Sequence, residues 1–107
     1  MLIYNKLVRD KIPEIIQGTG KVSNCITLEY ESYVSELKKK LREEVEEYNQ
    51  AGGDAEAVEE LADILEVVHA LAQLHKILPE DLEKVRAKKA EERGGFADRT
   101  FLIEVKE

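Results

Sequence analysis

The sequence predicts an all-α fold, a helical bundle in a single domain that spans residues 1–107. Three long segments place apolar residues at helical spacing, and glycine or proline residues stand between them. No tract rich in proline, glycine and serine is long enough to separate two domains. A chain of this length can bury only one modest core, so we expect oligomerisation to complete the bundle.

Two helices are expected in the first half of the chain. A short one should begin at Pro13, because proline fits the first turn of a helix but breaks its interior. A long one should cover residues 31–50 and end at Gly52 and Gly53, where we expect a left-handed cap.

Two more helices are expected in the second half. Asp54 is a suitable capping residue for a helix that continues to about Lys76. Apolar residues cover most of the circumference of this helix, so it should lie at the centre of the bundle or at a subunit interface. Pro79 should begin the last helix, and Gly94 should end it.

Two short segments could add a small β ribbon. Polar and apolar side chains alternate in residues 25–29, and residues 100–106 are rich in aromatic and β-branched side chains. We expect these two segments to pair if they meet in space.

Composition and charge restrict the classes of partner. The formal net charge of -7 repels polyanions, so neither nucleic acid nor an anionic membrane is an expected partner. No run approaches about 18 apolar residues, and the opening residues lack an apolar signal-peptide core. The single cysteine, Cys25, allows no intramolecular disulfide, and we expect a cytoplasmic protein.

Two acidic pairs, each with a spacing of three residues, follow one another closely. On a helical wheel, Glu44 falls inside the apolar stripe of the helix 31–50, and Glu47 falls on its edge. On the next helix, Glu60 and Asp63 share a sector with apolar side chains that must pack against something. Since a short loop favours antiparallel packing, the four carboxylates could converge on one volume.

Such a convergence of carboxylates would need a counter-charge. Like charges and desolvation both disfavour the ionised carboxylates, and a hard divalent cation would remove that penalty. Donors that are all oxygen suit Mg²⁺ or Mn²⁺, and Mg²⁺ commonly takes phosphate oxygens as further ligands. The alternative is an ordinary acid-rich surface that holds no metal.

The arrangement of the acids also resembles a known superfamily. The motif ExxE followed by ExxD reads here as "EVEE" at residues 44–47 and "ELAD" at residues 60–63. It is similar to the motif of the MazG-like all-α nucleoside triphosphate pyrophosphohydrolases, to which phosphoribosyl-ATP pyrophosphohydrolase and dimeric dUTPases are related. The opening "YNKLVRDKIPEI" looks like the start of small MazG-like proteins.

This resemblance implies a MazG-like bundle, present as a homodimer or homotetramer, that acts as a hydrolase on a nucleotide substrate. The implied reaction is Mg²⁺-dependent hydrolysis of a standard or non-standard nucleoside triphosphate to the monophosphate and pyrophosphate. The implied metal ligands, which are also the implied catalytic residues, are Glu44, Glu47, Glu60 and Asp63. The alternatives are phosphoribosyl-ATP pyrophosphohydrolase activity or a catalytically silent helical interaction module.

Basic residues should bind the phosphates of such a substrate. On the last expected helix, Lys89 and Arg93 lie close to the apolar direction of the wheel, which makes them candidates for phosphate binding. Equally, their stems could lie on the core with the charged groups in water. The sequence leaves open whether Lys6, Arg9 or Lys11 contacts substrate, and which base and sugar are preferred.

Overall fold

The computed structural model describes residues 1–107 and contains four α-helices and no β-strand, so the all-α prediction is confirmed. The helices are α1 (Ile12–Gly18), α2 (Tyr30–Asn49), α3 (Asp54–Leu74) and α4 (Pro79–Arg93). None of them combines the length and the apolar character that a membrane crossing requires.

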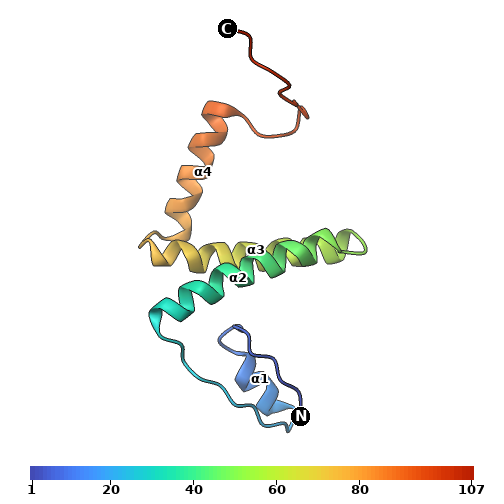
Figure 1. Ribbon diagram of the computed structural model, residues 1–107, viewed down its shortest axis with the longest axis vertical. Helices are drawn as coiled ribbons and strands as arrows, with labels where there is room; N and C mark the ends of the chain where they lie inside the picture. The colour runs from blue at the N-terminus through green and yellow to red at the C-terminus, as the bar shows by residue number, and fades with distance from the viewer.

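The packed part of the molecule is the hairpin of α2 and α3, which lie against one another along most of their length (Figure 1). Its buried apolar side chains are those of Leu37, Val67 and Ala72. The apolar stripes expected on the wheel explain this pairing, because each helix must cover its stripe against a neighbour. The hairpin is therefore the rigid frame on which the acidic residues are held.

The remaining elements extend away from this hairpin. Figure 1 shows α4 leaving the end of α3 at a steep angle, with the C-terminal segment beyond it and α1 on the opposite side of the hairpin. The radius of gyration is 18.3 Å, whereas a compact chain of this length would have about 13 Å. Only four of the 107 residues are buried, so a single chain covers little of its apolar surface.

The predicted β ribbon is wrong. Residues 25–29 lie in the extended segment that leads into α2, and residues 100–106 lie in the C-terminal segment beyond α4 (Figure 1). The hairpin stands between them, so the two segments do not meet. A two-stranded ribbon without a packed face is marginal in water, which leaves nothing to draw them together.

The predicted left-handed cap at Gly52 and Gly53 is also wrong. Helix α2 ends at Asn49, its C-cap residue Gln50 has a φ of -99°, and Gly53 is extended with a φ of -176°. Gly53 instead takes the cap position before α3, so Asp54 is the first residue of that helix rather than its cap. Gly94, by contrast, ends α4 with a φ of 81°, as the sequence predicts.

The left-handed turn that the sequence did not indicate lies after α3. Lys76 has a φ of 59°. The amide of Ile77 donates to the carbonyl of Ala72 over 3.2 Å, and the amide of Lys76 donates to the carbonyl of Gln73 over 2.9 Å. These are the two hydrogen bonds of a Schellman motif, in which the left-handed residue is usually glycine. The turn sets the direction in which the chain leaves α3 toward α4.

We expect Lys76→Gly to raise the free energy of unfolding by about 0.5–1 kcal/mol. A left-handed conformation costs a residue with a Cβ roughly 1–2 kcal/mol, and the greater freedom of glycine in the unfolded chain offsets part of that gain. Urea denaturation followed by circular dichroism measures the difference. Gln73→Gly, an exposed position with helical backbone on the same turn, should instead lose about 1 kcal/mol. Equal losses in both variants would contradict the left-handed cap.

Candidate metal centre

The hairpin brings together carboxylates from both of its helices. One carboxylate oxygen from each of three glutamates lies within 4.8 Å of the others, and these residues, here called the acidic cluster, are Glu44, Glu47 and Glu60. Two come from α2 at a spacing of three residues and one from the facing turn of α3. Residues three apart lie one above the other on a helix, so antiparallel packing places the third carboxylate beside the pair.

Glu44 is the most buried member of the acidic cluster. Only 6% of its surface is exposed, and its Oε2 has no hydrogen-bond partner. Its Oε1 lies 3.3 Å from Nζ of Lys40, one turn earlier on α2. One lysine thus compensates one oxygen of a buried carboxylate, and the other oxygen has no donor. An unsatisfied oxygen at this depth is costly, because it has lost its water without gaining a partner.

The burial and the crowding of the carboxylates have their largest effect on the pKa of Glu60. Desolvation by burial, followed by a hydrogen bond and charge repulsion from Glu47 and by the charges of Asp63 and Glu44, raises the pKa of Glu60 to about 7. Its Oε2 is buried and has no partner. Burial also raises the pKa of Glu44, although Lys40 works in the opposite direction. The single ammonium group of Lys40 therefore leaves the cluster with an excess of negative charge.

The fourth predicted ligand, Asp63, lies beside the acidic cluster but outside it. Its Oδ1 accepts a hydrogen bond from Nη2 of Arg9 over 2.5 Å. Its charge still acts on Glu60, which stands one turn earlier on α3. The structure thus brings three of the four predicted carboxylates together and pairs the fourth with a residue from the N-terminal segment.

The two cations at this site were not among the predicted site residues. Lys40 stands four residues before Glu44, a spacing at which opposite charges meet on a helix, so a signal for it was present in the sequence. The partner of Arg9 is 54 residues away along the chain. No local pattern indicates such a contact, and for that reason the role of Arg9 stayed open at the level of the sequence.

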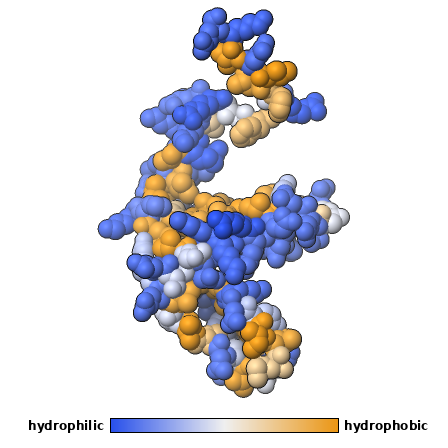
Figure 2. Space-filling view, in the orientation of Figure 1, coloured by the Kyte–Doolittle hydropathy of each residue, from blue (hydrophilic) through white to orange (hydrophobic).

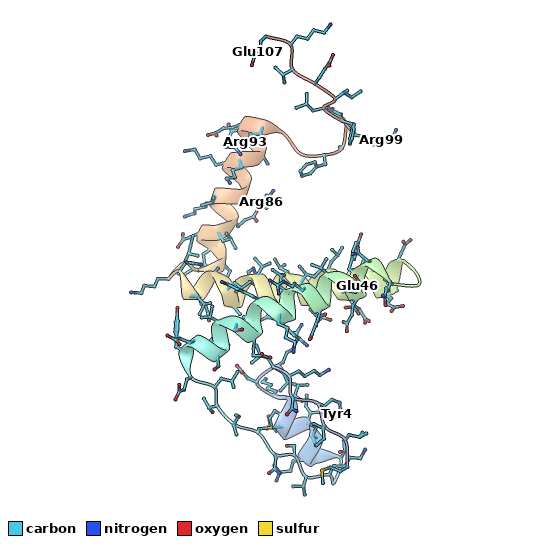
Figure 3. All side chains as sticks on the ribbon, viewed as in Figure 1. Tyr4, Glu46, Arg86, Arg93, Arg99 and Glu107 are labelled. Carbon is cyan, nitrogen blue, oxygen red and sulfur yellow. The ribbon has the colours of Figure 1, made fainter.

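The predicted phosphate-binding residues lie elsewhere in the single chain. Lys89 and Arg93 stand on the last turns of α4, and Figure 3 shows Arg93 at the end of α4 that is remote from the hairpin. No hydrogen bond or ion pair joins either residue to the acidic cluster. Their role stays a prediction, and within one chain the nearest cations to the carboxylates are Lys40 and Arg9.

The donor set fits a hard divalent cation. All its donors are carboxylate oxygens, Glu44 and Glu60 each have one buried oxygen without a partner, and no sulfur or imidazole is among the donors. Oxygen donors of this kind suit Mg²⁺ and Mn²⁺. A cation here would satisfy both orphan oxygens and relieve the repulsion that raises the pKa of Glu60.

Comparison with known proteins adds no relative. No protein-family model, no curated protein and no solved structure matches the chain.

We expect the metal-free protein to lose stability as the pH rises from about 5 to about 8. The unfolded chain releases the proton of Glu60 near its ordinary pKa of 4.5, whereas the folded chain retains it until about 7. The folded state thus binds more protons in this window, and its stabilisation is lost as the pH passes through 7. Thermal unfolding in EDTA across this pH range measures the slope.

Glu60→Gln should flatten that slope and unfold at a higher temperature than the wild type at pH 8, because the amide copies the neutral acid. Glu59→Gln, at the exposed neighbouring position, is the matched control and should keep the wild-type slope. A wild-type slope in the Glu60 variant would show that the acidic cluster does not hold this proton.

Proposed function

We propose that the chain is a Mg²⁺-dependent nucleotide pyrophosphohydrolase that hydrolyses a nucleoside triphosphate, standard or non-standard, to the monophosphate and pyrophosphate. One observation carries this proposal: the buried Glu44, one oxygen of which has no partner, lies together with two further carboxylates in the hairpin. Surface acids have no reason to adopt that geometry, because water satisfies them individually. The resemblance of the "EVEE" and "ELAD" segments to the MazG-like motif supports the choice of reaction.

The metal would be held by the acidic cluster together with Asp63. Bound there, Mg²⁺ or Mn²⁺ would neutralise phosphate oxygens and offset the charge that develops at the attacked phosphorus. The protein supplies the ligands on two packed helices, so their positions are defined before substrate arrives.

In the proposed reaction, water attacks phosphorus and the anhydride bond between the α and β phosphates breaks. A carboxylate of the acidic cluster accepts the proton of the attacking water, and pyrophosphate leaves with the electron pair of the broken bond.

Two alternatives remain beside this proposal. A phosphoribosyl-ATP pyrophosphohydrolase would use the same carboxylates on a substrate that differs in the group attached to the adenine. A catalytically silent interaction module would keep the fold but would not need the acids, and here all four acids of the motif are present. The orphan oxygens favour a metal-binding site over a module that has no use for the acids.

We also propose that the chain forms a homodimer or homotetramer of the MazG-like type. Val58, Leu61 and Leu65 lie on one face of α3 and are 63%, 49% and 53% exposed. Figure 2 shows apolar residues gathered along α3 and again on the C-terminal segment. A second copy would cover this face and supply the core that one chain lacks.

Pyrophosphate release from a panel of nucleoside triphosphates, with Mg²⁺ or with EDTA, tests the activity. Glu44→Gln and Asp63→Asn should each lower the rate by on the order of 100-fold, because each removes a charged ligand of the metal. Glu46→Gln is the matched control: Glu46 lies on the same helix, bonds only to Gln50 and should leave the rate unchanged (Figure 3). Turnover that persists in EDTA, or in both site variants, would contradict the proposal. Phosphoribosyl-ATP completes the panel.

Light scattering coupled to gel filtration tests the assembly. The wild type should elute with about two or four times the 12.2 kDa mass of one chain. Leu61→Glu should shift the mass toward one chain, since it places a charge on the covered face. Val22→Glu changes an apolar residue outside α3 that is 95% exposed, and it should leave the mass unchanged. A monomeric wild type would exclude this interface.

A further inference from the structure

We propose that Arg9 is a phosphate-binding residue of the acidic site and that it shares Asp63 with the metal. The inference rests on the proposed function, because it assigns to this chain the cation that contacts the substrate's polyphosphate. It starts from one contact, the hydrogen bond from Nη2 of Arg9 to Oδ1 of Asp63.

The position of Arg9 is unlike that of the other basic residues. Arg9 is the only basic side chain outside the hairpin that forms an ion pair with a hairpin residue. Its partner, Asp63, belongs to the "ELAD" segment. Figure 1 shows the N-terminal segment turning close to the hairpin before it enters α1. Lys40, the other cation here, is largely buried and committed to Glu44. Arg9 is therefore the cation on the accessible side of the site.

The guanidinium of Arg9 retains unused donors. Only its Nη2 donates to a protein oxygen, so its remaining N–H groups have no partner in the protein. The side chain is 56% exposed, and that of Asp63 is 39% exposed, so a ligand can reach both. A planar guanidinium with free N–H groups is suited to bidentate binding of phosphate oxygens.

The contact with Asp63 is weak enough to exchange. Exposed ion pairs contribute little to stability, and here the pair must also hold a segment whose helix, α1, packs against no other helix. A divalent cation on Asp63 and the guanidinium on Asp63 compete for the same negative charge. When the carboxylate of Asp63 binds the metal, Arg9 remains beside the site and its N–H donors are available for phosphate.

The competing explanation is that Arg9 only holds the N-terminal segment against the hairpin. The two explanations predict different changes in phosphate and metal binding when Arg9 is removed. If Arg9 only docks the N-terminal segment, its removal should disturb the site and weaken every ligand, or should change nothing. If it binds phosphate and competes with the metal, its removal should weaken phosphate binding while metal binding stays as tight or becomes tighter.

The test compares the wild type, Arg9→Ala and Arg9→Gln by isothermal titration calorimetry with two probes. The probes are Mg²⁺ alone and inorganic tripolyphosphate at saturating free Mg²⁺. Arg9→Gln keeps an N–H donor for Asp63 without the charge, so it carries the test if the alanine variant fails to fold. Lys11→Ala, which removes an exposed charge two residues away, is the matched control.

Both Arg9 variants should bind tripolyphosphate on the order of tenfold or more weakly than the wild type, since a charge-assisted contact is lost. They should bind Mg²⁺ as tightly as the wild type or roughly two- to fivefold more tightly, since a competing cation is removed. Lys11→Ala should match the wild type with both probes.

The assignment to Arg9 would be overturned if the Arg9 variants bound tripolyphosphate as tightly as the wild type does. It would also be overturned if Lys11→Ala lost as much tripolyphosphate affinity as the Arg9 variants. A parallel loss of Mg²⁺ binding would also overturn it, in favour of the explanation that Arg9 only holds the N-terminal segment. Each of these results requires a wild type that binds Mg²⁺. A wild type that binds no Mg²⁺ would overturn the proposed function and this inference together, so the two failures are distinguishable.

Discussion

The packing of α2 against α3 places a carboxylate where a hydrophobic side chain would normally stand. Leu37 and Glu44 are seven residues apart on α2, so they lie on one face of the helix, and both are buried against α3. The same contact that forms the small core therefore also removes Glu44 from water. Lys40, Glu47 and Glu60 are arranged around that constraint, and the raised pKa of Glu60 follows from it.

In this arrangement the hairpin gives up stability to hold a cluster of carboxylates, the candidate metal centre. A leucine at position 44 would enlarge the core of a chain that buries only three apolar residues. The acid instead leaves two buried oxygens without partners, and a cation would be the group that satisfies both. Local rules are broken in this way mainly where function requires it.

Periodicity predicted the parts of the site that lie on one helix or on two helices joined by a short loop. The inward position of Glu44 and the approach of Glu60 follow from the 3.6-residue period and from antiparallel packing. The contact between Arg9 and Asp63 depends on the path of the segment before α2, for which the sequence holds no local signal. The left-handed Lys76 was missed for a related reason, since only glycine usually marks such a turn.

The uneven packing of the chain implies a gradient of local opening. Amide hydrogens of α2 and α3 are protected by the only extensive helix contact, whereas α4 is attached at one end and α1 packs against no other helix. Hydrogen exchange should therefore be slow in the hairpin and fast at both ends of the chain. A ligand that binds the hairpin raises the free energy of local opening in the hairpin alone. The exchange rates of individual amide hydrogens in α2 and α3 would then show whether the ligand is bound.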